Sequence, residues 1–302
     1  MFFKTYKTTI KRIFRSPIFL MVLGIVTVLV FMEVYQGMYN SGPNTGDRSA
    51  GFVLGYHKYH EMMANLLRRM MLYTIPCLCV VTVMTVVSGD YSDNFFEIER
   101  AGGVKSAAYF FGRLSAILTV LFTIILVFSF FGVHCYFFTR GGVANFTAIP
   151  DNYIEDWPFT TLGAYMVDST KVLSRLVVLC QFPVIILFTA VTYVIGACLE
   201  SGIAAGIGGS IATVVSYLTA IRYQWDYLSA VYKYFLPAKI GPYLYLSRYD
   251  TVFASEKYTL PGGWNPFLED DFGDVVTWLA VMLGISLVCI LVSFICTHRR
   301  KI

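Results

Sequence analysis

The sequence predicts an all-α membrane protein that crosses the bilayer as six helices. Of its 302 residues, 57% are hydrophobic and only 14% are charged, and the mean hydropathy is +0.64. A soluble domain carries about 25% charged residues. The apolar residues also gather in runs close to the roughly 20 residues that a helix needs to cross hydrocarbon. We therefore expect one polytopic transmembrane domain covering residues 1–302.

Residues 1–16 predict an amphipathic helix that lies on the membrane surface before the first span. Apolar residues recur at helical spacing along one stripe, and basic residues lie roughly opposite. The stripe is Phe3, Tyr6, Ile10, Ile13 and Pro17, and the basic face is Lys4, Lys7, Lys11 and Arg15. Such a helix binds an anionic leaflet. A cleaved signal peptide is the competing interpretation, but no small-x-small cleavage site follows and the basic region is long.

The predicted spans follow this helix in order. They cover residues 17–35, 66–88, 107–134, 174–199, 202–221 and 275–297. The connections are an outer segment at 36–65, a charged loop at 92–105, an outer loop at 135–173 and an aromatic outer segment at 222–274. With both termini cytoplasmic, Lys and Arg, including Arg113, are roughly twice as dense in the inner segments, as the positive-inside rule requires.

The charged loop between the second and third spans predicts a short helix. Asn94 can cap its first turn, and Glu97 follows three residues later, where a carboxylate can reach back. Phe95 and Ile98 share a face of this helix. Gly102-Gly103 ends it, because glycine adopts the left-handed conformation at little cost. A helix across the foot of two spans would suit docking of a soluble partner, and an ordinary cytoplasmic loop is the alternative.

Small residues form a stripe along the fifth predicted span. Gly202, Gly206 and Ser210 recur every four residues, and Ala205 and Gly209 run beside them. This small-xxx-small pattern lets two helices approach closely. Packing within the chain and a contact between subunits are both compatible with the pattern.

The aromatic segment 222–274 contains a stretch that is apolar enough to resemble a seventh span. Pro237 and Pro242 argue against that, because each lacks a backbone donor, and Lys233 and Lys239 would place charge in hydrocarbon. Tyr and Trp prefer the membrane interface. We therefore expect short helices broken near the two prolines that dip into the outer leaflet, with a plain interfacial anchor as the alternative.

The sequence shows no constellation that would indicate an enzyme, a metal site or a cofactor site. His57 and His60 lack the His-Glu-x-x-His order of zinc proteases, so a solvated helix face is favoured. Val104 separates Gly103 from Lys105, so the core of a phosphate-binding loop is missing. The seven cysteines form no Cys-x-x-Cys pair. The net charge of +4 is spread along the chain and does not indicate nucleic-acid binding.

Taken in order, these features resemble the ABC-2-type permeases, the membrane subunits of ABC exporters. The shared features are a basic amphipathic helix, six spans with both termini inside, a very short turn between spans four and five, and the loop between spans two and three. That loop reads Gly89-Asp90-Tyr91, then Glu97, Arg100-Ala101-Gly102 and Ser106-Ala107-Ala108-Tyr109. The resemblance covers nearly the whole chain as architecture.

The resemblance implies a transport subunit that performs no bond chemistry itself. ATP and Mg²⁺ would bind to separate ATPase subunits, and a second permease copy or a homologue would complete a dimer in the plasma membrane, expected to be a bacterial cytoplasmic membrane. The implied ATPase-coupling residues are Asn94, Phe95, Phe96, Glu97, Ile98, Glu99, Arg100 and Ala101, with Glu200 as a lesser candidate. The helix-packing or dimer candidates are Gly202, Gly206, Gly209 and Ser210. The outer-gate candidates are Tyr234, Phe235, Pro237 and Pro242.

The substrate is the least determined part of this expectation. Members of the family handle peptides, drugs, lipid-linked glycans and ions, and the aromatic outer segment favours an amphipathic molecule such as an antimicrobial peptide. A secondary transporter is one alternative, although inverted repeats and midplane ion sites are not evident in the sequence. A membrane sensor whose outer loops bind a ligand is another.

Overall fold

The computed structural model describes residues 2–39, 70, 74–91, 95–139, 170–221 and 272–299. This part of the chain is helical apart from short turns and contains no strand. Its helices are α1 (Phe2–Arg15), α2 (Pro17–Tyr39), α4 (Ile75–Tyr91), α5 (Phe95–Ala101), α6 (Ser106–Thr139), α8 (Thr170–Cys198), α9 (Gly202–Ile221) and α14 (Phe272–Arg299). The all-α prediction is confirmed for these residues.

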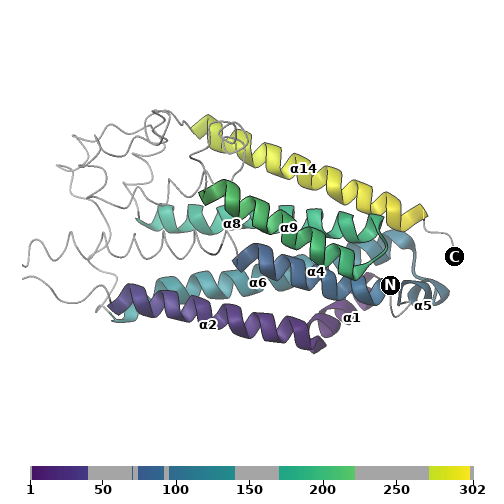
Figure 1. Ribbon diagram of the computed structural model, residues 1–302, viewed down its shortest axis with the longest axis horizontal. Coiled ribbons are helices and arrows are strands. Elements are labelled where there is room, and N and C mark those ends of the chain that lie inside the picture. Colours follow the sequence, from purple (N-terminus) through teal and green to yellow (C-terminus); the bar gives the residue numbers. More distant parts are fainter. Residues whose placement is uncertain are drawn as a thin grey trace, which may run out of the picture.

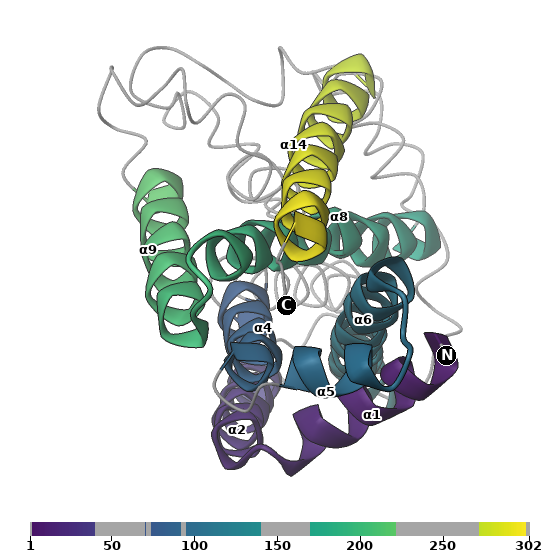
Figure 2. The ribbon, with the colours of Figure 1, turned by 90° about the vertical axis from the view of Figure 1, so that its right-hand side faces the viewer.

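The long helices run roughly along one axis, whereas α1 and α5 lie across one end of the bundle (Figures 1 and 2). The C-terminal end of α14 lies at that same end, which we call the α5 end. The core forms where α4, α6 and α8 meet, and α2 and α14 pack against it. Its fully buried members include Leu78, Ile117, Leu121, Val184 and Ile185.

Several helices are long and apolar enough to cross a membrane. Among the described residues these are Ser106–Phe130, Gln181–Cys198 and Leu279–Arg299, with the bent pair Phe2–Arg15 and Pro17–Met32 as a fourth if it forms one span. Large apolar side chains cover outward faces of α2, α6, α9 and α14, as lipid-facing helices require. The chain is therefore a polytopic helical membrane protein. The described parts of α4 and α9 are shorter apolar helices, so six spans remain a prediction.

The break between α1 and α2 has a local cause in the sequence. The two helices meet at 67°. The Ser16 hydroxyl accepts a hydrogen bond from the backbone N–H of Phe19 at 3.3 Å, which caps the start of α2. Pro17 follows at the first helical position, where its missing N–H is not needed. The bend lays α1 across the α5 end instead of letting it continue along the bundle.

α1 is the helix that the sequence predicts, but the side facing the bundle differs from the predicted apolar stripe. Thr5, Thr9 and Ile13 are the buried residues, whereas Phe3 is exposed. Polar side chains can face inward because α1 crosses α6 at Gly112, where an added Cβ would lie only 3.3 Å from Thr5 Cβ. The basic residues Lys4, Lys7, Lys11 and Arg15 are exposed. A position at the membrane surface remains a prediction for this helix.

The glycine stripe of α9 packs against α4 of the same chain. A Cβ added at Gly202 would lie 2.5 Å from the Ser88 Cα, and one added at Gly206 would lie 2.7 Å from the Met84 Sδ. Gly209 is likewise in contact with α4, but Ser210 is exposed. The glycines therefore bring two helices of one chain together, which is the intramolecular alternative. Whether α9 also contacts a second copy remains a prediction.

We expect Gly202→Ala to destabilise the protein more than Gly206→Ala. At Gly202 the new methyl group meets the α4 backbone, which must move, at an overpacking cost of about 1–3 kcal/mol. At Gly206 it meets the flexible end of Met84, which can turn aside. Gly202 is the first residue of α9 and Gly206 lies in its interior, so Gly206→Ala also gains the larger helix propensity, about 1 kcal/mol. Packing and propensity therefore both place its thermal unfolding midpoint in detergent above that of Gly202→Ala. Equal midpoints would contradict this account of the α4–α9 contact.

Candidate functional site

The candidate site is α5 with the helix ends beneath it. Figure 2 shows α5 across the ends of α4 and α6. Gly103 has a left-handed φ of 83°, and the N–H of Val104 donates to the carbonyl of Glu99 at 3.1 Å. This is the Schellman arrangement that ends a helix with glycine, so the predicted stop at Gly102-Gly103 is confirmed. The turn directs the chain from α5 straight into α6.

The inner side of α5 is held by aromatic contacts. Phe96 is only 3% exposed and packs against Val104 and Tyr109, with its ring 4.9 Å from the Tyr109 ring in an edge-on arrangement. Phe95 lies beneath two guanidinium groups, those of Arg12 and Arg113, each 5.3 Å from its ring centre. From the sequence, both phenylalanines are expected on a docking surface. Phe96 does not lie on such a surface, because the chain itself covers its side chain; its part in ATPase coupling stays a prediction.

Glu99 also points inward, toward α1. The Thr5 hydroxyl donates to the Glu99 carboxylate at 2.7 Å, and the Thr9 hydroxyl donates to the Thr5 carbonyl at 2.8 Å. Glu99 is among the buried residues, and this hydrogen bond fastens α5 to α1; its part in ATPase coupling stays a prediction. This bond joins residues 94 positions apart in the chain.

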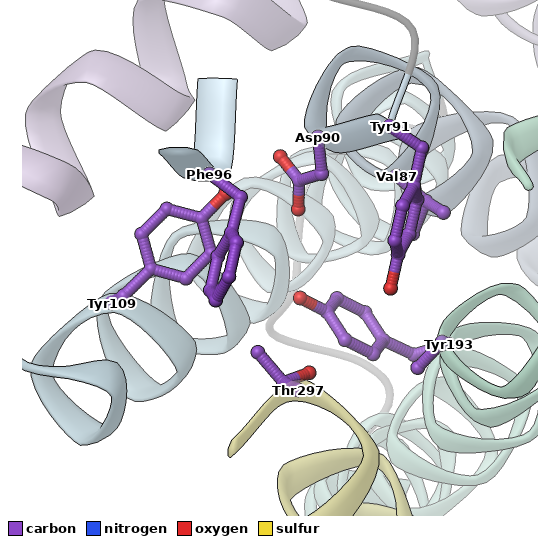
Figure 3. A pocket seen from close by; sticks show the side chains of 8 residues that line it. Val87, Asp90, Tyr91, Phe96, Tyr109, Tyr193 and Thr297 are labelled. Carbon is purple, nitrogen blue, oxygen red and sulfur yellow. The ribbon is translucent and has the colours of Figure 1, made fainter. Parts of the chain in front are cut away.

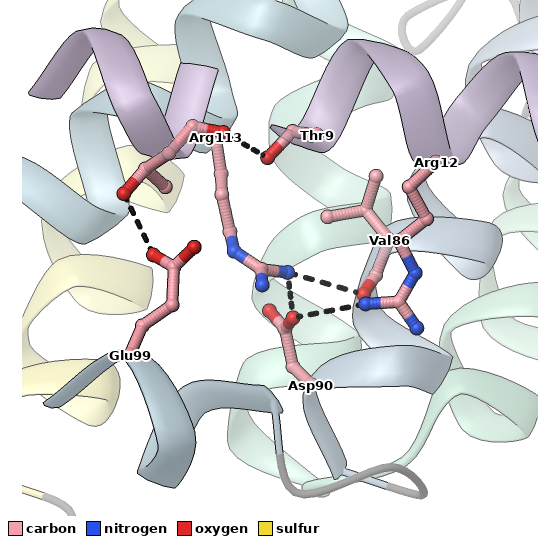
Figure 4. A network of polar contacts seen from close by, with 7 residues as sticks. Thr9, Arg12, Val86, Asp90, Glu99 and Arg113 are labelled. Carbon is pink, nitrogen blue, oxygen red and sulfur yellow. Dashed lines mark hydrogen bonds and ion pairs between the residues drawn. The ribbon is translucent and has the colours of Figure 1, made fainter. Parts of the chain in front are cut away.

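A buried ionic cluster lies directly beneath α5 (Figure 4). Arg113 of α6 is fully buried and forms an ion pair with Asp90 at the end of α4. Its guanidinium also donates to the Val86 carbonyl at 3.4 Å and lies 4.2 Å above the Tyr109 ring. Arg12 of α1 approaches the same carboxylate at 4.0 Å. One carboxylate thus joins three helices, since a buried charge is tolerated only with partners.

Gly89 leaves room for the Arg12 side chain against α4. A Cβ added at Gly89 would overlap the Arg12 guanidinium, so the lack of a side chain there lets Arg12 lie flat against α4. From the sequence, Gly89 and Asp90 are expected in the loop. α4 instead continues through Tyr91, which carries Asp90 into the bundle, because burial against Arg113 fixes this last turn.

Sequence reasoning missed this cluster as a site. It treated Arg113 only as a cytoplasmic cation. The signal that could have revealed it is position: Arg113 lies two turns inside an otherwise apolar helix that begins at Ser106. A charge at that depth needs a partner, and Asp90 is the acid at the facing end of the preceding span. The pattern does not show that Arg12 completes the group.

A small enclosed cavity lies beside Asp90 (Figure 3). Its volume is about 10 Å³, the space of about one water molecule. The cavity is lined by Val87, Asp90, Tyr91, Phe96, Tyr109, Tyr193, Ala197 and Thr297. These residues come from α4, α5, α6, α8 and α14, so the ends of five helices line one cavity beside the Asp90 carboxylate.

The outer side of α5 presents Glu97, Ile98 and Ala101, which are exposed. Ile98 is 62% exposed and is the large apolar side chain on this outer side of α5. Asn94 and the side chain of Arg100 lie outside the described residues. The predicted coupling set is therefore split: part of it faces outward, and Phe96 and Glu99 fasten α5 to the bundle.

Glu200 forms the turn between α8 and α9. Its φ of 50° is left-handed, a conformation that disfavours a side chain. The N–H of Ser201 donates to the Gly196 carbonyl at 3.2 Å, and the Ser201 hydroxyl accepts from Ala204 N–H at 3.2 Å and caps α9. Glu200 is exposed and remains a lesser coupling candidate. The outer-gate candidates Tyr234, Phe235, Pro237 and Pro242 lie outside the described residues.

The arrangement at the α5 end joins the ends of several helices and shows no feature of a catalytic centre in the described residues. Its buried charges hold helix ends together, and its exposed helix offers a surface. No family model matches the chain, and no curated protein sequence matches it either.

Proposed function

We propose that this chain is the membrane subunit of an ABC exporter of the ABC-2 type and that α5 is the helix on which a separate ATPase acts. The observation that carries the proposal is the two-sided character of α5. Its outer side exposes an isoleucine, while its inner side is joined to α1, α4 and α6. A short helix of this kind can receive a movement from a soluble partner and pass it to membrane helices.

The connections define how a movement of α5 would be passed on. Phe96 packs against Tyr109 of α6, and Glu99 accepts a hydrogen bond from Thr5 of α1. Phe95 contacts the guanidinium groups that hold Asp90 of α4. Because packed interiors deform little, displacement of α5 would shift the ends of these helices together. The proposed mechanism is this coupled shift, driven by closure of the ATPase.

Charge favours a cytoplasmic location for the α5 end. Basic residues of α1, α5–α6 and α14 gather there, including Lys4, Lys7, Lys11, Arg15, Lys105 and Arg299. Cytoplasmic segments carry an excess of Lys and Arg. In this proposal the chain lies in the plasma membrane of a bacterium, pairs with a second permease copy or homologue, and exports an amphipathic substrate such as a peptide. ATP and Mg²⁺ act on the partner.

The alternatives fit the position of the buried charges less well. A secondary transporter places its ion-binding groups near the bilayer midplane. Among the described residues, the buried charged side chains are Asp90, Glu99 and Arg113, and all three lie at the α5 end. A membrane sensor would not need a short exposed helix such as α5 to be joined to α1, α4 and α6.

We expect Ile98→Asp to weaken ATPase binding by about 10- to 100-fold. Burying an isoleucine side chain contributes about 1.5–3 kcal/mol, which corresponds to that change in affinity. Because Ile98 is 62% exposed, it has little packing to lose, and the variant should unfold like the parent. The measurement is the ATPase that co-purifies with the tagged chain from native membranes, together with ATP hydrolysis of the recovered complex. Ile98→Leu is the matched control and should retain both.

Two outcomes would count against the proposal. If no ATPase co-purifies with the unaltered chain in mild detergent, the exporter assignment fails, and a secondary transporter or a sensor becomes the better hypothesis. If an ATPase co-purifies and Ile98→Asp binds it normally, α5 is not the docking element, and the Glu200 turn is tested next.

A further inference from the structure

We infer that Cys198 and Cys296 form a reversible disulfide modification site that joins the C-terminal ends of α8 and α14. Their Sγ atoms lie 3.5 Å apart, although the residues are 98 positions apart in the chain. Cys198 is exposed and Cys296 is partly exposed. The two thiols are therefore already in contact, near the ends of two candidate spans and not fully covered by the rest of the described chain. This inference is independent of the proposed transport function.

The geometry requires only a small movement to form the bond. A disulfide has an S–S distance of about 2.05 Å, so the sulfur atoms must approach by about 1.5 Å. Cys198 is the last residue of α8, and Cys296 lies in the last turn of α14. Helix ends fray and adjust more readily than helix interiors, so the approach can be accommodated there. Because α8 and α14 pack along each other, the two thiols are held together before reaction.

The chemistry needs an oxidant of the peroxide class. The thiolate of one of the two cysteines attacks a peroxide oxygen: the O–O bond breaks, an S–O bond forms, and with hydrogen peroxide the leaving oxygen departs as water after protonation. The sulfur of the other cysteine then attacks the sulfenic sulfur, forming the S–S bond and releasing the second oxygen as water. The two thiols lose two electrons and two protons in total, and hydrogen peroxide becomes two water molecules. A dithiol reductant reverses the reaction by exchange.

The two cysteines are sequence neighbours of residues that line the cavity beside the buried ionic cluster. Ala197 precedes Cys198 and Thr297 follows Cys296, and both neighbours line the cavity beside Asp90. A disulfide would therefore fix two helix ends that meet at this cavity. Oxidation would restrain the α5 end without touching the Asp90–Arg113 pair itself.

Cys289 provides a matched control on the same helix. It lies seven residues before Cys296, which is about 10 Å along the helix axis, and it is partly exposed like Cys296. A disulfide from Cys198 to Cys289 would require α14 to slide by about two turns. The serine variants of Cys296 and Cys289 each remove one partly exposed thiol from α14. They differ in whether the removed thiol lies next to Cys198.

The test is to treat the purified full-length chain in lipid nanodiscs with hydrogen peroxide, denature it, and count free thiols with a polyethylene-glycol maleimide. The unaltered chain, with seven cysteines, should fall from seven conjugates to five and return to seven with dithiothreitol. Cys289→Ser should likewise lose two thiols on oxidation. Cys296→Ser and Cys198→Ser each keep one member of the pair, so each can lose at most that single thiol, as a sulfenic acid, and neither should form the intramolecular disulfide.

Peptide mass spectrometry of the oxidised unaltered chain identifies the bond without relying on any variant. A linked peptide pair that contains Cys198 and Cys296 is expected, from a chain that remains monomeric on a non-reducing gel. The inference is overturned if the unaltered chain keeps seven free thiols, if the linked pair contains a different cysteine, or if the bond joins two copies of the chain.

Discussion

Arg113→Ala should destabilise the protein by about 3–5 kcal/mol, the usual cost of removing one partner from a buried ion pair. Arg113 is fully buried, and its removal leaves the Asp90 carboxylate in the bundle with only the more distant Arg12 guanidinium. The variant also loses the stacking of the guanidinium on Tyr109. The measurement is the thermal unfolding midpoint in detergent, supported by the yield of folded chain. Lys105→Ala, at an exposed position in the same segment, is the control.

Two further variants separate charge from packing. Arg113→Lys keeps the positive charge but cannot stack as a planar group or donate in a fixed fork, so an intermediate loss is expected. Asp90→Asn leaves two guanidinium groups without their shared carboxylate and should also be severe. If Arg113→Ala unfolds within about 0.5 kcal/mol of Lys105→Ala, the range of ordinary surface changes, the cluster does not hold the helix ends together.

The contrast between predicted and observed features follows from what a sequence pattern encodes. Apolar runs of the right length predict the long helices, and two consecutive glycines predict the end of α5, because both depend on neighbours in sequence. The hydrogen-bond partner of Glu99 is Thr5, which is 94 residues away in the chain. No local sequence pattern carries that information. For the same reason, the glycines of α9 indicate a close approach but not that the approaching helix is α4.

The misassignment of Phe96 has a related cause. Two adjacent phenylalanines on a charged loop indicate that something covers them, because exposed apolar patches are unusual. The pattern does not distinguish a partner protein from the chain itself. The structure separates their roles: Phe96 packs on Tyr109, and Phe95 lies beneath the two guanidinium groups. Replacing both with aspartate would therefore loosen α5 and could not test docking by itself.

Phe96→Ala should cost about 3–5 kcal/mol, the range for deleting a buried phenylalanine, whereas Ile98→Ala should cost little. The two residues lie on the same short helix, but Phe96 is 3% exposed and Ile98 is 62% exposed. Loss of the Phe96 ring removes its packing on Val104 and Tyr109, which is the apolar attachment of α5 to α6. The thermal unfolding midpoints of the two variants give the comparison.

Hydrogen exchange at the backbone amides of α5 localises the effect. With Phe96→Ala, the amides of residues 95–101 should exchange faster even where the rest of the bundle keeps its protection, because a loosened element opens before the whole protein unfolds. With Ile98→Ala they should exchange as in the parent. Equal midpoints and equal exchange for the two variants would contradict the packing of Phe96. If instead Phe96→Ala frees α5 and Ile98→Asp only releases the ATPase, then α5 has one side that holds it to the bundle and another that receives the partner.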